Sequence, residues 1–188
     1  MRPQKVQPWG GAILALAIAM GISACGEDFQ TPVVAAEEAG DFNALVDLWG
    51  AKADGDDIEA LLQVGALYEA GPETIQDFAA AVSAYSRGVE LGDTTSMIRL
   101  GALYERGLGV DRDPQEALAL FTQASEQGDP IGHYRVARLY DGTMLGPADY
   151  SEAMEWYEFA AEQGVIEAQV ELANHHFAGL FMPRDTDK

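Results

Sequence analysis

Hydrophobic and small residues recur with two periods along this chain of 188 residues. Over short stretches the apolar positions lie three or four residues apart, as they do on one face of an amphipathic helix. Val64, Leu67 and Tyr68 are one such set, and Leu120, Phe121 and Ala124 are another. Over longer distances the same pattern returns every 36 residues. The sequence therefore predicts pairs of amphipathic helices arranged as repeats.

The 36-residue period aligns several columns of aromatic and small residues. The columns are Tyr68, Tyr104, Tyr140 and His176; Gly92, Gly128 and Gly164; Ala81, Ala117 and Ala153; Tyr85, Phe121 and Tyr157; and Gly65, Gly101, Ala137 and Ala173. The small residues of the last column are expected to let a paired helix approach closely, with the aromatic column filling the neighbouring volume. No single unit can bury its apolar face alone, so the units must stack on one another.

Helix ends are marked by residues with known end preferences. Asp113, Pro114 and Glu116 give an aspartate cap, a proline at the first helical position and a glutamate at the third. Asp149 and Asp129 open two further helices. Glycines follow the helices and are expected to take the left-handed conformation of a C-terminal cap; they include Gly71, Gly92, Gly107, Gly109, Gly128, Gly142 and Gly164.

The columns divide the chain into regions. We predict a helical repeat domain over residues 41–182, with complete units at 56–92, 93–128 and 129–164. Half units precede and follow them at 41–55 and 165–180, and residues 183–188 form a tail. Because the stack ends after half a unit, an apolar face near Phe177, Phe181 and Met182 is left for the tail, another copy or a partner to cover.

The first 24 residues have the order of a secretory signal. Arg2 and Lys5 precede an uncharged apolar run at 12–20, and small residues follow. That run is shorter than the roughly 20 residues that a permanent transmembrane helix needs. Cys25 comes next and is the only cysteine, so no intramolecular disulfide can form. An ordinary cleaved signal with a chance cysteine is the alternative interpretation of this segment.

Residues 22–25, Ile-Ser-Ala-Cys, resemble the lipobox of bacterial lipoproteins. The resemblance implies a signal peptide over 1–24, lipidation of Cys25, and anchoring in the cell envelope of a Gram-negative-type bacterium, facing the periplasm. Gly26 stands where inner-membrane lipoproteins have a retention aspartate, which favours the outer membrane. Residues 25–40 are rich in Pro, Ala, Thr and Glu and are expected to form a flexible tether without packed structure.

The charge balance excludes some partners. The chain has 11 basic and 31 acidic residues, a net charge of −20. Removal of residues 1–24 would take away Arg2 and Lys5 and no acid, leaving nine bases and a net charge of −22. Nucleic acid binding needs a basic face, so we expect no nucleic acid partner. Most of the acidic residues are expected to keep the surface solvated and the protein soluble.

The repeats resemble the Sel-one-like repeat family, a relative of the tetratricopeptide repeats. The likeness rests on residues 103–110 with Asp113 and Ala117, and on residues 156–164. It implies a right-handed α-solenoid that acts as a scaffold or adaptor and binds a protein or peptide partner on its concave face. The loops that begin at Gly71 and Gly142 depart from the Gly-x-Gly-Val turn of the second unit. A cysteine-rich branch of the family is associated with β-lactam binding or hydrolysis, but its paired cysteines are absent here.

No candidate for catalysis or metal binding outweighs a structural role. Adjacent side chains on a helix point about 100° apart, so His175 and His176 do not chelate one ion well. They occupy columns of the stack and are expected to form a partly polar end cap. His133 is expected to pack or to lie on the surface, and Asp111 and Asp113 lack the remaining ligands of a calcium loop. We therefore expect no enzyme activity, no metal and no cofactor.

Three arginines form the candidate binding site. Arg99 and Arg135 share one column of the first helices, and Arg138 lies one helical turn further on. On the concave face they would recognise carboxylates of a partner peptide. The alternative is that they are surface arginines paired with Glu69, Glu105 and Asp141. An envelope enzyme or ligand binder for β-lactam or peptidoglycan compounds is the alternative function, and a structural spacer is a third.

Overall fold

The computed structural model describes residues 27–142 and 144–178, and every regular element in these two ranges is an α-helix. The helices are α2 (Glu27–Ala39), α3 (Phe42–Ala53), α4 (Ile58–Ala70), α5 (Phe78–Glu90), α6 (Thr94–Arg106), α7 (Pro114–Glu126), α8 (Pro130–Asp141), α9 (Tyr150–Glu162) and α10 (Ile166–Ala178). The predicted signal peptide, Cys25 and the tail at 183–188 lie outside the described residues.

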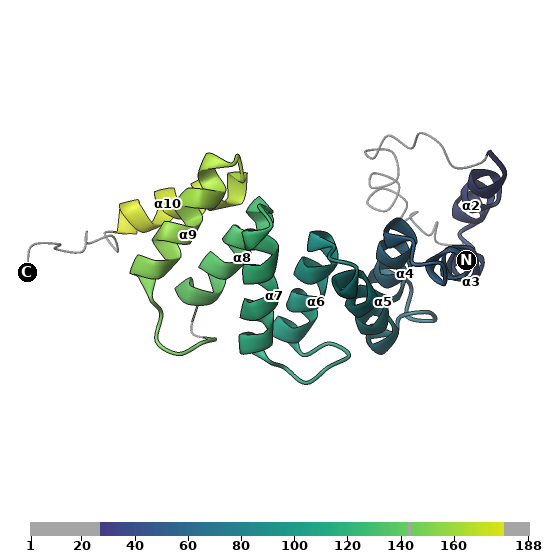
Figure 1. Cartoon of the computed structure of the whole chain (residues 1–188), viewed down its shortest axis with the longest axis horizontal. Helices are drawn as coiled ribbons and strands as arrows, with labels where there is room; N and C mark the ends of the chain where they lie inside the picture. Colours follow the sequence, from purple (N-terminus) through teal and green to yellow (C-terminus); the bar gives the residue numbers. More distant parts are fainter. Residues whose placement is uncertain (1–26, 143, 179–188) are drawn as a thin grey trace, which may run out of the picture.

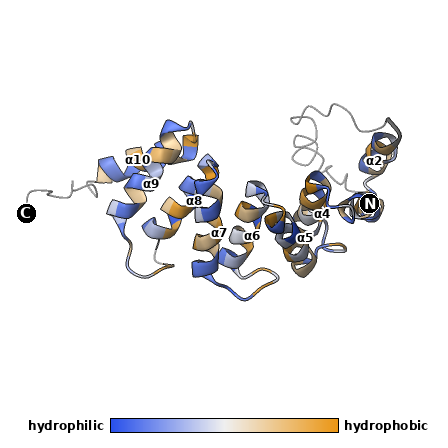
Figure 2. Cartoon of the chain, viewed as in Figure 1, coloured by the Kyte–Doolittle hydropathy of each residue, from blue (hydrophilic) through white to orange (hydrophobic). Residues whose placement is uncertain are grey.

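Consecutive helices pack against one another along the whole row. The row is elongated, with α2 and α10 at opposite ends (Figure 1). The pairs α4–α5, α6–α7 and α8–α9 make the most extensive contacts and form three complete hairpins. Each helix carries hydrophobic and hydrophilic residues side by side (Figure 2), so that its apolar positions face its neighbours in the row. The predicted all-α solenoid of helical hairpins is confirmed.

Aspartate caps the N-terminus of every helix from α3 to α9. The capping residues are Asp41, Asp57, Asp77, Asp93, Asp113, Asp129 and Asp149. Each carboxylate accepts a hydrogen bond from a backbone N–H two or three residues further on, which satisfies donors that the first turn leaves free. The position equivalent to these residues before α10 is Val165, which is buried.

Contacts between an aromatic and a small residue join the two helices of a hairpin. A Cβ atom added to Gly65 would collide with the ring of Tyr85, and one added to Gly101 would collide with Phe121. Tyr85, Phe121 and Tyr157 are all less than 2% exposed. The structure thus places the aromatic column directly against the small-residue column, and the absence of a side chain at Gly65 and Gly101 makes room for the rings.

Two of the predicted left-handed glycines do not take that conformation. Gly92, Gly107, Gly109, Gly128 and Gly164 have φ between +70° and +91°. The prediction is wrong for Gly71 and Gly142, which have φ of −70° and −80° in an extended conformation. Both begin the loops that depart from the turn of the second unit. A residue before proline is restricted to extended conformations, and Pro72 follows Gly71.

The predicted tether is wrong over most of its length, because residues 27–39 form helix α2. Val33 and Ala36 are buried against Leu45 and Trp49 of α3. The ring of Phe29 meets that of Trp49 edge-on, with centroids 5.0 Å apart. Phe29, Val33 and Ala36 lie on one face of the helix at spacings of four and three. The half unit predicted at 41–55 is therefore the second helix of a further hairpin.

Candidate functional site

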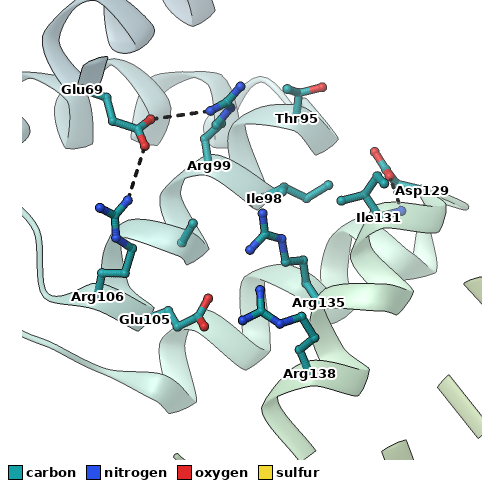
Figure 3. A pocket seen from close by; sticks show the side chains of 11 residues that line it. Glu69, Thr95, Ile98, Arg99, Glu105, Arg106, Asp129, Ile131, Arg135 and Arg138 are labelled. Atoms are coloured by element: carbon teal, nitrogen blue, oxygen red, sulfur yellow. Dashed lines mark hydrogen bonds and ion pairs between the residues drawn. The ribbon is translucent and has the colours of Figure 1, made fainter. Parts of the chain in front are cut away.

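A cavity of about 570 Å³ opens on the side of the row formed by the first helices of the units. Helix α6 lies against α8 as well as against α7, and these two first helices supply most of the lining. The charged lining residues are Glu69, Arg99, Glu105, Arg106, Asp129, Arg135 and Arg138. Ile98, Ala102 and Ile131 add apolar wall between them. Four of the nine bases that follow residue 24 therefore meet in one place (Figure 3).

Glu69 organises one side of the cavity. Its carboxylate oxygens lie 3.8 Å from the guanidinium of Arg99 and 3.8 Å from that of Arg106. It also accepts a hydrogen bond of 3.1 Å from the hydroxyl of Tyr85. Burial and the charge of Glu69 raise the pKa of Tyr85 well above its ordinary value, so this hydroxyl stays protonated and donates. The distances of 3.8 Å are too long for hydrogen bonds, which leaves the arginine N–H groups able to bind a ligand.

Arg135 is the least compensated cation of the cavity. Its Nε atom is buried and has no hydrogen-bond partner among the described residues. Burial, and then the positive charge of Arg138, lower the pKa of Arg135, while Glu105 opposes the shift. A buried N–H without an acceptor costs on the order of 1–3 kcal/mol.

Glu105 differs from the equivalent acids in the neighbouring units. Tyr85 donates to Glu69, and Tyr157 donates to Asp141 over 3.1 Å in the same way. The second unit has Phe121 at this position, which carries no hydroxyl. The carboxylate of Glu105 is thus not held by an aromatic hydroxyl, and it lines the cavity near Arg135. Because Phe121 replaces a tyrosine, the carboxylate of the second unit lacks the hydroxyl donor that its two neighbours have.

The structure brings together the three arginines that the sequence singled out. The alternative pairing holds for Arg99, which meets Glu69. Within the described ranges no carboxylate oxygen lies at ion-pair distance from Arg135 or Arg138, and the guanidinium of Arg138 lies 6.0 Å from the ring centroid of Tyr134. Sequence reasoning missed Arg106, because it occurs in one unit only and forms no column.

His175 and His133 pack against neighbouring side chains. His175 is 6% exposed, and its Nε2 lies 3.2 Å from Asp141, whereas His176 is exposed. The ring of His133 packs beside Trp156 and Phe159. No group of three or more potential metal ligands is found in the part of the chain that the structure describes. Nor does any helix of these residues have the length and apolar character to span a membrane.

The repeats identify the family. The family model described as Sel1 repeat matches residues 58–93, 94–129, 130–165 and 166–188, so the chain belongs to the Sel1 repeat family. Proteins of this family are typically non-catalytic scaffolds that mediate protein–protein interaction. No curated protein sequence matches the chain.

Solved structures agree with this assignment. A Sel1 repeat protein from Oxalobacter formigenes has a TM-score of 0.66 and 25% identity, over 73% of this chain and 55% of its own. The protein c5321, a protective antigen of uropathogenic Escherichia coli with an SLR fold, has a TM-score of 0.63 and 27% identity, over 71% and 28%. The immunity protein Pa5087 from Pseudomonas aeruginosa shares the fold at 16% identity, with a TM-score of 0.52 over 94% and 61%. The chain thus spans less than two thirds of each of these neighbours.

Proposed function

We propose that this protein is a lipid-anchored adaptor of the cell envelope that binds a protein or peptide partner through carboxylates. The observation that carries the proposal is the convergence of Arg99, Arg106, Arg135 and Arg138 on one cavity in a chain of net charge −20. Guanidinium groups bind carboxylates through paired, charge-assisted hydrogen bonds. The apolar wall of Ile98 and Ile131 would contact side chains next to the bound carboxylate.

The acidic remainder of the molecule supports specificity at this cavity. An acidic partner is repelled by most of the surface and attracted where the arginines gather. Glu69 lies at ion-pair distance from both Arg99 and Arg106, so its charge draws these two arginines to the same side of the cavity before binding. Arg135 and Arg138, which have no carboxylate at ion-pair distance among the described residues, gain most from a bound anion.

The cavity is tested by cross-linking in intact cells. A photo-reactive amino acid in place of Thr95, which lines the cavity, is expected to cross-link a defined protein partner. The double substitution Arg99→Glu and Arg135→Glu is expected to reduce that product at least about tenfold, because opposite charge becomes like charge. Arg87→Glu is the matched control, since Arg87 pairs with Asp56 and does not line the cavity. Capture that survives the double substitution would overturn the proposed site.

Anchoring is a separate part of the proposal and needs its own measurement. We propose that Cys25 carries the lipid, that residues 1–24 are cleaved, and that the repeats face the periplasm, with the outer membrane favoured. Metabolic labelling with a fatty acid is expected to mark the wild-type chain and not Cys25→Ser. Fractionation is expected to place the wild-type chain with the membrane. Equal labelling of both chains would contradict the anchor without bearing on the cavity.

A further inference from the structure

The last helix exposes a continuous apolar stripe. Ile166, Val170 and Phe177 are 71%, 52% and 96% exposed, and Ala173 is also exposed. These four residues, here called the α10 stripe, lie at spacings of four, three and four along α10. That spacing is the seam by which one helix packs lengthwise against another. The stripe therefore has the pattern of a helix–helix interface.

The repeat shows which way the stripe faces. In α6 the equivalent positions are Thr94, Ile98, Gly101 and Glu105. Thr94 donates a hydrogen bond of 2.8 Å to Asp129, which caps the first helix of the next unit. Gly101 lies under the ring of Phe121 from the second helix of its own unit. The α10 stripe is thus the surface on which further helices would stack if the row continued.

The stripe becomes more apolar where the described row ends. Phe177 stands in the column of Glu69, Glu105 and Asp141, where each preceding unit has a carboxylate. A terminal repeat that faces water needs a polar outer face for solubility. Here the carboxylate of the column is replaced by Phe177, which is 96% exposed and makes the outer face less polar. The phenylalanine at position 177 indicates that another helix covers the stripe.

We propose that this helix is α10 of a second copy of the chain, packed antiparallel across a two-fold axis. Antiparallel packing places Ile166 opposite Phe177 and Val170 opposite Ala173, so large residues surround a centre of small ones. The helices within each hairpin of this fold are also antiparallel neighbours. The second α10 thus approaches from the side on which the second helix of a hairpin packs against the first, as α7 packs against α6.

Charge also favours a second copy. In the antiparallel arrangement the residues beside the stripe pair as Glu167 with Asn174 and Gln169 with His176, so no carboxylate faces another. Glu171 points further from the seam and accepts a hydrogen bond from Asn174 of its own helix. Two copies of a chain with a net charge of −20 can therefore meet at this surface without direct acid–acid contact.

Sedimentation equilibrium tests the dimer. The full chain with Cys25→Ser is expected to reach twice the chain mass as its concentration rises. Val170→Asp with Phe177→Asp is expected to weaken self-association about a hundredfold, because buried charge replaces apolar contact. Val34→Asp is the matched control, since Val34 is 46% exposed at the other end of the row, and it is expected to remain dimeric. Circular dichroism shows whether each variant keeps its helices.

Cysteine pairing tests the orientation. In the Cys25→Ser chain, Ile166→Cys and Phe177→Cys are made as separate single variants, because in the antiparallel pairing each of these residues lies opposite the other and about 16 Å along the helix from its own copy. Oxidation of a mixture of the two is expected to give a disulfide-linked dimer, and oxidation of either variant alone is expected to give none. Efficient cross-linking of Ile166→Cys alone would indicate parallel helices and overturn the antiparallel arrangement.

Other occupants give different outcomes. If residues 179–188 of the same chain or a different protein cover the stripe, the full chain remains monomeric at all concentrations, which overturns the proposal. A dimer that survives Val170→Asp with Phe177→Asp also overturns it, since the contact then lies elsewhere. Loss of the dimer in that double variant alone, with the Val34→Asp control unchanged, supports it.

Discussion

Single side chains decide how tightly each hairpin closes. Phe121 is fully buried and lies against Gly101, and its ring belongs to a cluster with Ala117, Val136 and Leu139. It therefore contacts its own unit and the next one. The ring of Phe121 therefore stabilises both the packing within one hairpin and the packing between two hairpins. Its removal is expected to destabilise the next unit as well as its own.

We expect Phe121→Ala to lower the free energy of unfolding by about 3–5 kcal/mol, because the substitution removes a buried ring and leaves a cavity. Chemical denaturation monitored by circular dichroism measures the change. Phe159→Ala is the matched control: Phe159 is 58% exposed, and we expect a change within about 0.5 kcal/mol. Equal losses in the two variants would contradict the assigned burial.

At the scale of the helix, the aspartate caps set where each element begins. Asp113 accepts hydrogen bonds from Gln115 and Glu116 at 3.0 and 3.1 Å, and Pro114 adds a preorganised first residue. The same arrangement recurs at each helix from α3 to α9, so the caps fix the frame in which the apolar residues of neighbouring helices meet.

We expect Asp113→Ala to cost about 1 kcal/mol of stability, because two backbone donors of α7 lose their acceptor. Asp111→Ala provides the comparison in the same loop; Asp111 is not a cap, and its loss is expected to change stability by less than about 0.5 kcal/mol. The denaturant midpoints of the two variants, measured under the same conditions, show whether the loss at Asp113 is the larger. If Asp111→Ala proved the more damaging, capping would not be the source of the stability.

The same substitution at two helical glycines is expected to have opposite effects. Gly101→Ala would drive a Cβ into the ring of Phe121 and destabilise the hairpin by about 1–3 kcal/mol. Gly50 has open space around the position of its Cβ, so Gly50→Ala is expected to stabilise α3 by about 0.5–1 kcal/mol. Thermal melting of both variants tests the difference in sign. A gain in stability at Gly101 would mean that the ring can move aside at little cost.

Across the whole molecule, charge opposes folding. A net charge of −20 on 188 residues makes the compact state self-repelling. Raising NaCl from 0.02 to 0.5 M, with screening lengths from roughly 20 to 4 Å, is expected to raise the melting temperature by about 2–4 °C. Calorimetry measures the shift, and a melting temperature that fell with salt would show that ion pairs outweigh the repulsion.

Much of the fold could be predicted because each sequence pattern that marks a helix or its end occurs several times, once in each repeat. The aromatic and small-residue columns recur, and Asp113, Asp129 and Asp149 mark helix starts that the structure contains. Helix α2 was not predicted, since it lies outside the 36-residue register and its proline-containing composition is typical of a linker. The apolar face of α2 can be recognised only in the tertiary structure, where Phe29 and Val33 pack against Trp49 of α3.

The candidate site was predicted in part. Arg99 and Arg135 share a column, which is visible in the sequence, whereas Arg106 enters the cavity from a position without a counterpart. The sequence also could not decide which acid meets which base. Asp141 accepts a hydrogen bond from Tyr157 and lies close to the ring of His175. Glu69 lies at ion-pair distance from two arginines of the next unit.

The sequence alone determined the helical hairpins, their register and most of their ends, because these depend on local periodicity and on caps within three residues. Only the tertiary structure decided that four arginines share one cavity, that Arg135 keeps a buried donor without an acceptor in the described chain, and that the α10 stripe remains uncovered there. These features depend on distances between units, which are set by how side chains of neighbouring helices pack and not by the order of residues within any one helix.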